Sequence, residues 1–168
     1  MKTALTIVAW ICTSGLAYAD LASDPPSVVK NYATRASLST GQYKSDGDMV
    51  RACSTYVEIP SPSADSLKNN IAYYIEGSFE RVAQVRLVLN VNSPVDSEQA
   101  LQELSKAAAV VVANAVGKPI PAEITKAILK YERDQHWRTG VYDIKLTLIK
   151  WNTGSGSYTM RFTIDVVK

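Results

Sequence analysis

The stretch 141-VYDIKLTLIKWNTGSGSYTMRFTIDVVK-168 holds two alternating runs of apolar and polar residues on either side of a Gly/Ser-rich segment. Apolar side chains fill every second position of both runs: Tyr142, Ile144, Leu146 and Leu148, then Tyr158, Met160, Phe162, Ile164 and Val166. This period is typical of strands with one covered face. Because Asn152 to Ser157 supplies turn residues, the sequence predicts a C-terminal β-hairpin with a long loop. The intervening side chains of the second strand are expected to point to solvent or to a partner: Thr159, Arg161, Thr163 and Asp165.

Upstream of the hairpin, the pattern predicts one strand followed by two helices. Residues 79–91 alternate in the same way and predict a strand. Residues 93–117 start with Ser-Pro-Val-Asp, typical of a capped helix start, and end at a glycine. The buried stripe of this helix is expected to contain Leu101, Leu104, Ala108, Val111, Val112 and Ala115. A second helix is predicted from Pro121 to about Arg133.

The first half of the chain is less regular. Leu67, Ile71 and Tyr74 follow a helical spacing between Ser63 and Gly77, which predicts a helix over 63–77. Residues 20–62 are rich in Ser, Pro, Asp and Gly and predict an irregular N-terminal arm. Within it, a short helix is predicted over 27–35 and a loop over 39–47, whereas 49–59 does not separate strand from helix.

These elements predict the α+β class. The expected architecture is an antiparallel sheet of three to five strands with helices packed on one face, ending in the C-terminal β-hairpin. Residues 63–168 form the α+β domain, and together with the arm they give a single mature domain over 20–168.

The first nineteen residues resemble a signal peptide in their composition. Lys2 precedes a short apolar stretch, and Ala17-Tyr18-Ala19 places small residues at the −3 and −1 positions of a cleavage site. The apolar stretch falls short of the ~20 residues that cross a bilayer core, and no later run is longer. We therefore expect residues 1–19 to be removed, and a periplasmic or secreted protein with no transmembrane segment after leader cleavage.

The charge balance does not indicate nucleic-acid binding. After Lys2 leaves, 17 basic residues face 16 acidic ones, and the basic residues are dispersed along the chain. A nucleic-acid-binding domain usually carries a clustered excess of Lys and Arg. We therefore expect no nucleic-acid partner.

Cys53 is the one cysteine left after the leader. A single thiol in an oxidising compartment has three interpretations: a buried small hydrophobe, an intermolecular disulfide, or a reactive nucleophile. Since free cysteine is among the most buried residue types, the first is the leading expectation.

The residues that carry chemistry are few. Cys53 and His136 are the only pair from which a nucleophile and base could be built, and no local signature supports a hydrolase. One His and one Cys do not make a metal site, and Asp46-Gly47-Asp48 lacks the remaining ligands of a calcium loop. We expect no catalytic, cofactor-binding or metal-binding residues and no cofactor.

Recognition of another protein is the function that remains. Trp137, Tyr142 and Trp151 lie on the C-terminal hairpin, and Trp and Tyr concentrate binding energy at interfaces. Trp151 is expected to share a mixed strand face with Val141, Asp143, Lys145, Thr147 and Ile149, unless a helix or the arm covers it. The leading hypothesis is a non-catalytic protein that binds a protein partner, as an inhibitor, an immunity factor or an envelope accessory subunit.

A second hypothesis is a small-ligand carrier. In this case the long helix leaves an apolar cleft above the sheet, and small residues at 107–109 and at Ala113 give it space. These alanines also suit close packing of the helix on the sheet. A Cys53/His136 hydrolase is a remote third hypothesis.

Overall fold

The structure is a computed structural model, and it describes residues 19–61, 67–152 and 155–167. Apart from Ala19, the predicted leader lies outside the described residues, as does the first part of the helix predicted over 63–77. The class is α+β, as predicted.

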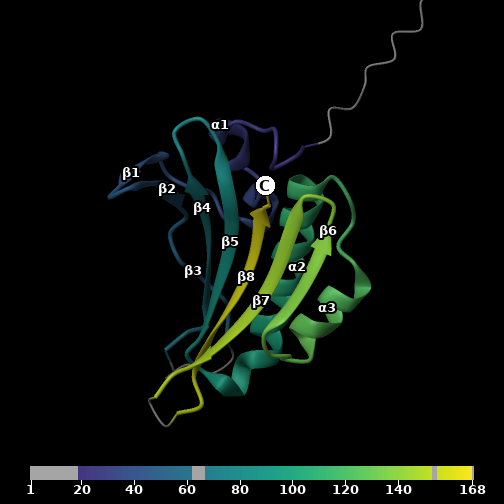
Figure 1. Ribbon diagram of the computed structural model, residues 1–168. Helices are drawn as coiled ribbons and strands as arrows, with labels where there is room; N and C mark the ends of the chain where they lie inside the picture. Colours follow the sequence, from purple (N-terminus) through teal and green to yellow (C-terminus); the bar gives the residue numbers. More distant parts are fainter. Residues whose placement is uncertain (1–18, 62–66, 153–154, 168) are drawn as a thin grey trace, which may run out of the picture.

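One antiparallel sheet dominates the described residues. Its eight strands are β1 (Lys44–Asp46), β2 (Met49–Cys53), β3 (Val57–Glu58), β4 (Asn70–Gly77), β5 (Val82–Val91), β6 (Gln135–Thr139), β7 (Tyr142–Lys150) and β8 (Tyr158–Val166). The strand order is β1-β2-β4-β5-β8-β7-β6, with β3 also paired to β4 (Figure 1). The prediction of three to five strands was too small. Three strands come from the segment 20–62, β4 comes from the stretch predicted as helix, and β6 lies between the second predicted helix and the predicted hairpin.

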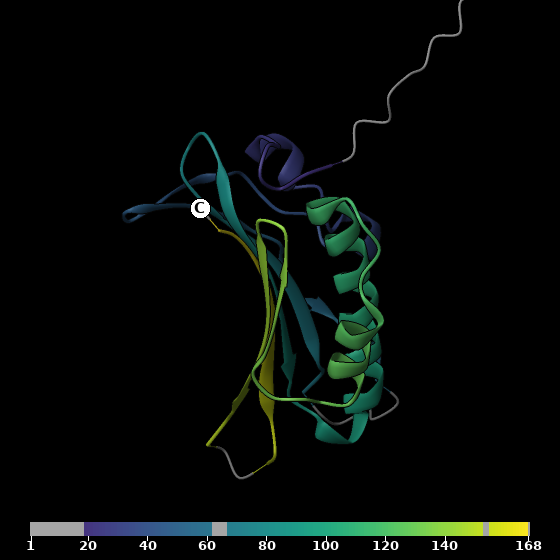
Figure 2. The ribbon, with the colours of Figure 1, turned by 45° about the vertical axis from the view of Figure 1, so that its right-hand side comes forward.

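The helices lie on one side of this sheet, as Figure 2 shows edge-on. They are α1 (Pro26–Val29), α2 (Ser97–Val116) and α3 (Ala122–Leu129), with short 3-10 turns η1 (Thr34–Ala36) and η2 (Pro94–Asp96). The long helix α2 contacts the central strands β5 and β8, and α3 lies against α2. No helix of the described residues covers the other face of the sheet.

The C-terminal hairpin is confirmed. Strands β7 and β8 pair from Tyr142↔Val166 to Lys150↔Tyr158. The alternating side chains that the sequence placed inside are buried, except that Val166 is half-buried. The same holds for β5, whose predicted inward residues Val85, Leu87, Leu89 and Val91 are fully buried. Period two therefore located the centre of the sheet correctly, because each of these strands buries one face on the helix side of the sheet.

The helix predicted over 93–117 is confirmed as α2, with its whole predicted stripe buried. Gly117 ends it in a left-handed conformation with φ 69°. At its start, Ser93 does not form the expected capping box. The chain makes the η2 turn first, and the Ser93 hydroxyl donates to Asp96 Oδ2 at 3.0 Å. The second helix, α3, stops at Leu129, earlier than predicted, and Tyr131 adopts a positive φ of 57° soon after it.

The helix predicted over 63–77 is wrong for its described part, which forms strand β4. Ile71, Tyr73 and Ile75 are buried, so the inward positions follow period two. Gly77 does not cap a helix. It lies at a register shift beside β5, where a Cβ would meet the Arg81 carbonyl and approach the Ala83 nitrogen to 2.7 Å. The glycine thus marks a close approach of two backbones.

The segment 20–61 is joined to the core at several points. Leu21, Val29, Tyr32 and Leu38 are among its buried side chains. The buried hydroxyl of Tyr73 donates to the Val29 carbonyl at 3.0 Å. On the other side, the Leu21 amide donates to the Ala115 carbonyl at 2.9 Å and Asn114 Nδ2 donates to the Tyr32 carbonyl at 2.8 Å. These bonds attach the segment both to β4 and to the end of α2.

Replacing Leu38 by Ala tests this attachment, because Leu38 is 0% exposed whereas Leu67, which the predicted helix would have buried, is 75% exposed. Leu38→Ala should lower the free energy of unfolding by about 2 to 5 kcal/mol, as expected for a cavity in a packed core. Leu67→Ala, the matched control, should change it by less than about 0.5 kcal/mol. Urea unfolding followed by circular dichroism measures both. Equal effects of the two variants would contradict the packing described.

Candidate functional site

The uncovered side of the sheet carries the largest organised set of polar and aromatic side chains. We call it the outer face: Arg51, Cys53, Asn70, Tyr74, Glu76, Gln84, Arg86, Asn90, His136, Arg138, Asp143, Lys145, Thr147, Ile149, Trp151, Thr159, Arg161, Thr163 and Asp165. These positions alternate along each strand with the buried ones. Because the strands are in register, the side chains form rows that cross the sheet. No described helix lies over this side (Figure 2).

Two acidic residues, Glu76 and Asp165, connect side chains of neighbouring strands within these rows. Glu76 Oε1 lies 3.2 Å from Arg51 Nε and 2.5 Å from Arg86 Nη2, so one carboxylate joins β2, β4 and β5. Asp165 Oδ1 accepts from Gln84 Nε2 at 2.6 Å, and its Oδ2 lies 2.9 Å from Lys145 Nζ. These pairs are partly shielded, with side-chain exposures of 12% at Glu76 and 22% at Asp165. They hold long side chains in defined positions on the outer face.

The row continues to the β6 edge through Asp143. Its Oδ1 lies 3.4 Å from His136 Nε2 and 3.9 Å from Arg138 Nε. Both distances exceed those of well-formed hydrogen bonds. Asp143 Oδ1 is a buried atom with no hydrogen bond within the described residues, as are Gln84 Oε1 and Arg86 Nε. The outer face thus keeps polar atoms beneath its surface that have no hydrogen bond to another described residue.

An aromatic and cationic group lies on the β2–β5 side of the outer face. The Arg86 guanidinium carbon is 5.4 Å from the centre of the Tyr74 ring, within cation–π range. The Tyr74 hydroxyl donates to the Tyr56 hydroxyl at 3.0 Å. Partial burial, and then this hydrogen bond, raise the pKa of Tyr74 above its ordinary value. The Tyr74 phenol therefore stays neutral near pH 7, and the two tyrosines present amphipathic rings.

A chain of hydrogen bonds orders the opposite end. Trp151 Nε1 donates to Thr159 Oγ1 at 3.0 Å, and that hydroxyl donates to Asn90 Oδ1 at 2.9 Å. Asn90 Nδ2 then donates to Asn70 Oδ1 at 3.0 Å. The indole is half-buried, and Ile149 beside it is 38% exposed. Trp151 is thereby oriented by its polar end while part of its ring stays accessible.

Arg161 lies between these two groups at the centre of the sheet. It is exposed, and it faces Val88 on β5 and Thr147 on β7 in the strand register. Its guanidinium forms no hydrogen bond or ion pair with another residue of the described chain. Five donors are therefore free for a group from outside.

The three aromatic residues predicted to contact a partner do not share one surface. Trp151 lies on the outer face with Asp143, Lys145, Thr147 and Ile149, as its strand parity indicated. Tyr142 points to the helix side, is 7% exposed, and its hydroxyl is bonded to Asp20. Trp137 also faces the helix side and is half-buried against the core. Only Trp151 of the three lies with the polar rows.

Sequence reasoning missed Tyr74, Glu76 and Arg51 as members of this surface. Tyr74 and Glu76 fall in the stretch predicted as helix, and Arg51 falls in the stretch with no assigned structure. A signal was present, because polar or amphipathic residues at 70, 74 and 76 alternate with apolar ones at 71, 73 and 75. The outward direction of Arg161, Thr163 and Asp165 was predicted correctly.

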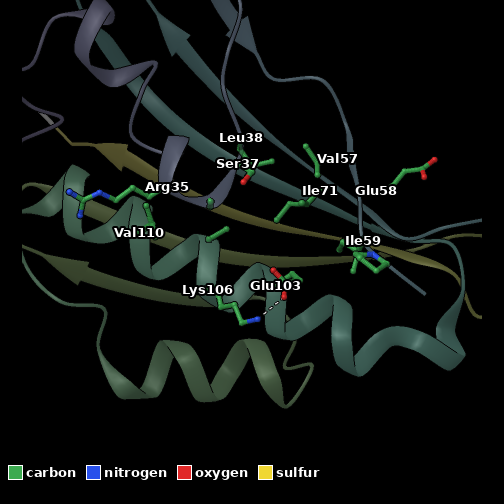
Figure 3. Close-up of a pocket in the computed structure, with 13 residues that line it drawn as sticks. Arg35, Ser37, Leu38, Val57, Glu58, Ile59, Ile71, Glu103, Lys106 and Val110 are labelled. Atoms are coloured by element: carbon green, nitrogen blue, oxygen red, sulfur yellow. Dashed lines mark hydrogen bonds and ion pairs between the residues drawn. The ribbon is translucent and has the colours of Figure 1, made fainter. Parts of the chain in front are cut away.

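A groove of about 320 Å³ lies on the helix side, between α2, η1 and the strands β3 and β4 (Figure 3). Its apolar lining includes Leu38, Val57, Ile59, Ile71, Ala107 and Val110. Three of the charged side chains at its rim are paired: Lys106 Nζ lies 2.7 Å from Glu103 Oε1, and Glu58 Oε2 lies 3.0 Å from Lys68 Nζ. Arg35, beside Val110, forms no ion pair with a described residue.

The alanines that the carrier hypothesis expected to give space for a ligand differ in their surroundings. Ala107 lines it, whereas Ala108 is fully buried in the core. Ala109 and Ala113 line a smaller hollow of about 260 Å³ that shares Arg35 and Val110 with the groove. Ala108 therefore allows close packing of α2 on the sheet, whereas Ala107, Ala109 and Ala113 border open space.

Cys53 and His136 are not brought together. Cys53 is exposed, so the expectation of a buried thiol was wrong: its strand β2 directs position 53 to the outer face, next to Tyr74. His136 lies on β6, five strands away in the sheet order. At ~4.8 Å per strand, the two strands are about 24 Å apart, far beyond hydrogen-bond reach.

Among the described residues, no helix has the length and apolar character of a membrane span, and no three His, Cys, Asp or Glu side chains are grouped to hold a metal ion. Comparison with protein-family models, curated proteins and solved structures finds no match for this chain.

Proposed function

We propose that this chain is an exported, non-catalytic protein, periplasmic or secreted, that binds another protein through the outer face of its sheet. An inhibitor, an immunity factor or an envelope accessory subunit would work in this way. Export is supported by the composition of residues 1–19. The observation that carries the binding proposal is the bare outer face, with exposed Arg161 between an ordered tyrosine pair and an ordered tryptophan.

The physical case rests on preorganisation. A protein interface loses free energy when flexible side chains must be ordered on binding. On the outer face the ion pairs of Glu76 and Asp165 already order Arg86 and Lys145, and a hydrogen bond to Asp165 orders Gln84. A partner would therefore meet side chains that have lost much of their rotamer freedom in folding. Tyr, Trp and Arg, the types that most often dominate binding energy, are all present.

The charge pattern also indicates the kind of partner. Cationic and anionic side chains are interspersed on the outer face, so it has no single-sign field for nucleic acid or anionic lipid. Its accessible free hydrogen-bonding capacity is concentrated at Arg161. A folded protein that presents a carboxylate to Arg161 would match it. Mixed polarity of this sort favours a specific partner over a general adhesive role.

Substitutions at the centre of the outer face test the proposal. Arg161→Glu and Ile149→Asp, separately and together, should leave the fold intact because both side chains are exposed. A partner captured by the wild type from envelope extract, then purified, should bind each variant at least about tenfold more weakly by calorimetry.

Lys130→Glu is the matched control, since Lys130 is exposed on the helix side just after α3. Its affinity for the same purified partner should stay within about twofold of the wild type. If the outer-face variants bind as tightly as the control, the partner uses another surface and the proposal fails.

The groove favours a second candidate function, carriage of a small ligand. Its volume of about 320 Å³ is at the lower end of ligand pockets, and it holds roughly ten water-sized groups. An apolar floor with Arg35 as its unpaired charge suits a short apolar chain that ends in a carboxylate. The salt bridge between Lys106 and Glu103 lowers the competing charge at the rim.

Octanoate is a probe of the required size and charge. It should bind with amide shifts confined to residues that line the groove, in an NMR titration of the labelled protein. Arg35→Gln should weaken this binding about threefold to tenfold, because one charge-assisted contact is lost. Arg81→Gln, at an exposed cation in the turn before β5, should leave it unchanged. Equal affinity for octanoate and octylamine would contradict the role of Arg35, and the absence of shifts would remove the carrier function.

A further inference from the structure

The residues just after the predicted cleavage site form a tight turn that returns to their own start. The Asp20 backbone nitrogen donates to Asp24 Oδ2 at 3.0 Å, and the Asp24 nitrogen donates to the Asp20 carbonyl at 2.8 Å. Asp24 Oδ2 also accepts from the Tyr32 hydroxyl at 2.6 Å. Leu21, between the two aspartates, is fully buried. The position of the Asp20 nitrogen is therefore fixed by a carboxylate and by core packing.

The carboxylates of this turn accept hydrogen bonds from neutral donors. Asp20 Oδ1 accepts from the Ala22 amide at 3.0 Å and from the Tyr142 hydroxyl, and Asp24 accepts from Tyr32. Neither forms an ion pair with a residue of the described ranges. Burial first, and then the Asp24 carboxylate, raise the pKa of Tyr32 well above its ordinary value. Two carboxylates thus lie near one backbone nitrogen, and no Lys or Arg of the described residues is within ion-pair distance of either.

We propose that leader removal at the Ala19–Asp20 bond supplies the missing cation, because the new α-ammonium of Asp20 forms at the nitrogen already held by Asp24. We name Asp20 and Asp24 together the N-terminal cradle. The inference rests on the export proposed above, and it adds a role for the processed end: processing completes the folded structure as well as releasing the chain.

The chemical step balances with water alone. An export peptidase adds water across the Ala19–Asp20 peptide, and the C–N bond breaks. The hydroxyl joins the Ala19 carbonyl carbon, which leaves with the leader as a carboxylate. The Asp20 nitrogen takes up the remaining hydrogen of the water and the proton that the new carboxylic acid releases, and it becomes an ammonium group near pH 7. Before cleavage this nitrogen offers one neutral donor, and afterwards it offers three charge-assisted donors, so its bond to Asp24 becomes stronger.

A set of chains that differ only at the N-terminus tests the inference in vitro, without dependence on export. One chain starts at Asp20, and the other carries one additional residue, Ala19, which moves the amine away from Asp24. The chain that starts at Asp20 should melt on the order of 3 °C higher at pH 6.5 in low salt. In the Asp24→Asn background the two chains should melt at the same temperature. Asp48→Asn, an exposed turn carboxylate outside the cradle, should preserve the difference.

The pH dependence separates an ion pair from simple packing. An amine beside carboxylates has a raised pKa, so its stabilisation is present below its ordinary value of about 8 and is lost as the pH rises through the raised value. The difference between the two chains should therefore shrink toward pH 10. The other groups around this amine are Tyr32, Tyr142 and Lys118, which both chains share.

Two results would overturn the inference: equal melting temperatures for the two chains at pH 6.5, or a difference that persists unchanged in Asp24→Asn. The export proposal has its own measurement, the intact mass of the protein recovered from the periplasmic fraction. A mass that includes the leader would remove the biological setting, whereas the cradle would still be judged by the melting experiment.

Discussion

Burial of the α2 stripe against β5 and β8 is the interaction on which the rest of this structure depends. These two strands are central in the sheet, and their inward side chains are buried under the helix. Every other element is placed by reference to this layer: α3 lies along α2, the hairpin extends from β8, and the N-terminal segment attaches at Ala115 and Tyr73. Since the helices use one face, the second face must satisfy its own polar groups. It does so for most of them with side-chain ladders between strands, and leaves a few buried atoms such as Asp143 Oδ1 without a described partner.

The sequence predicted the elements whose pattern is set by that layer. Strands β5, β7 and β8 and helix α2 each bury one face in the core. Their apolar residues therefore recur at period two or at 3.6, and these elements were located correctly. The stretch over 70–77 failed because Leu67, Ile71 and Tyr74 also fit a helical spacing, and pairing with β2 and β5 decides the outcome. Short strands such as β1 and β3 depend on the strand beside them. Their own composition carries little information.

For the candidate site, too, the predictions were correct where the strand itself had been identified from the sequence. Arg161 and Asp165 were placed on the outward side because their strand was identified, and Trp151 was assigned to the correct mixed face. Tyr142 and Trp137 were grouped with Trp151 by closeness in sequence, yet strand parity separates them. The groove is not readable from sequence, because it lies where η1 meets β3 and α2, three segments with no shared motif. Contacts between distant segments set such a surface.

The exposed thiol of Cys53 has a practical consequence for work on the mature chain. With Cys12 in the predicted leader, a maleimide dye would attach to the processed protein at one position without any engineered cysteine. That position pairs with Tyr74 at the margin of the outer face, on the opposite side of the sheet from α2. An environment-sensitive fluorophore there would respond to a macromolecule settling on the strands, while an apolar acid entering beneath the helix would leave its emission unaltered.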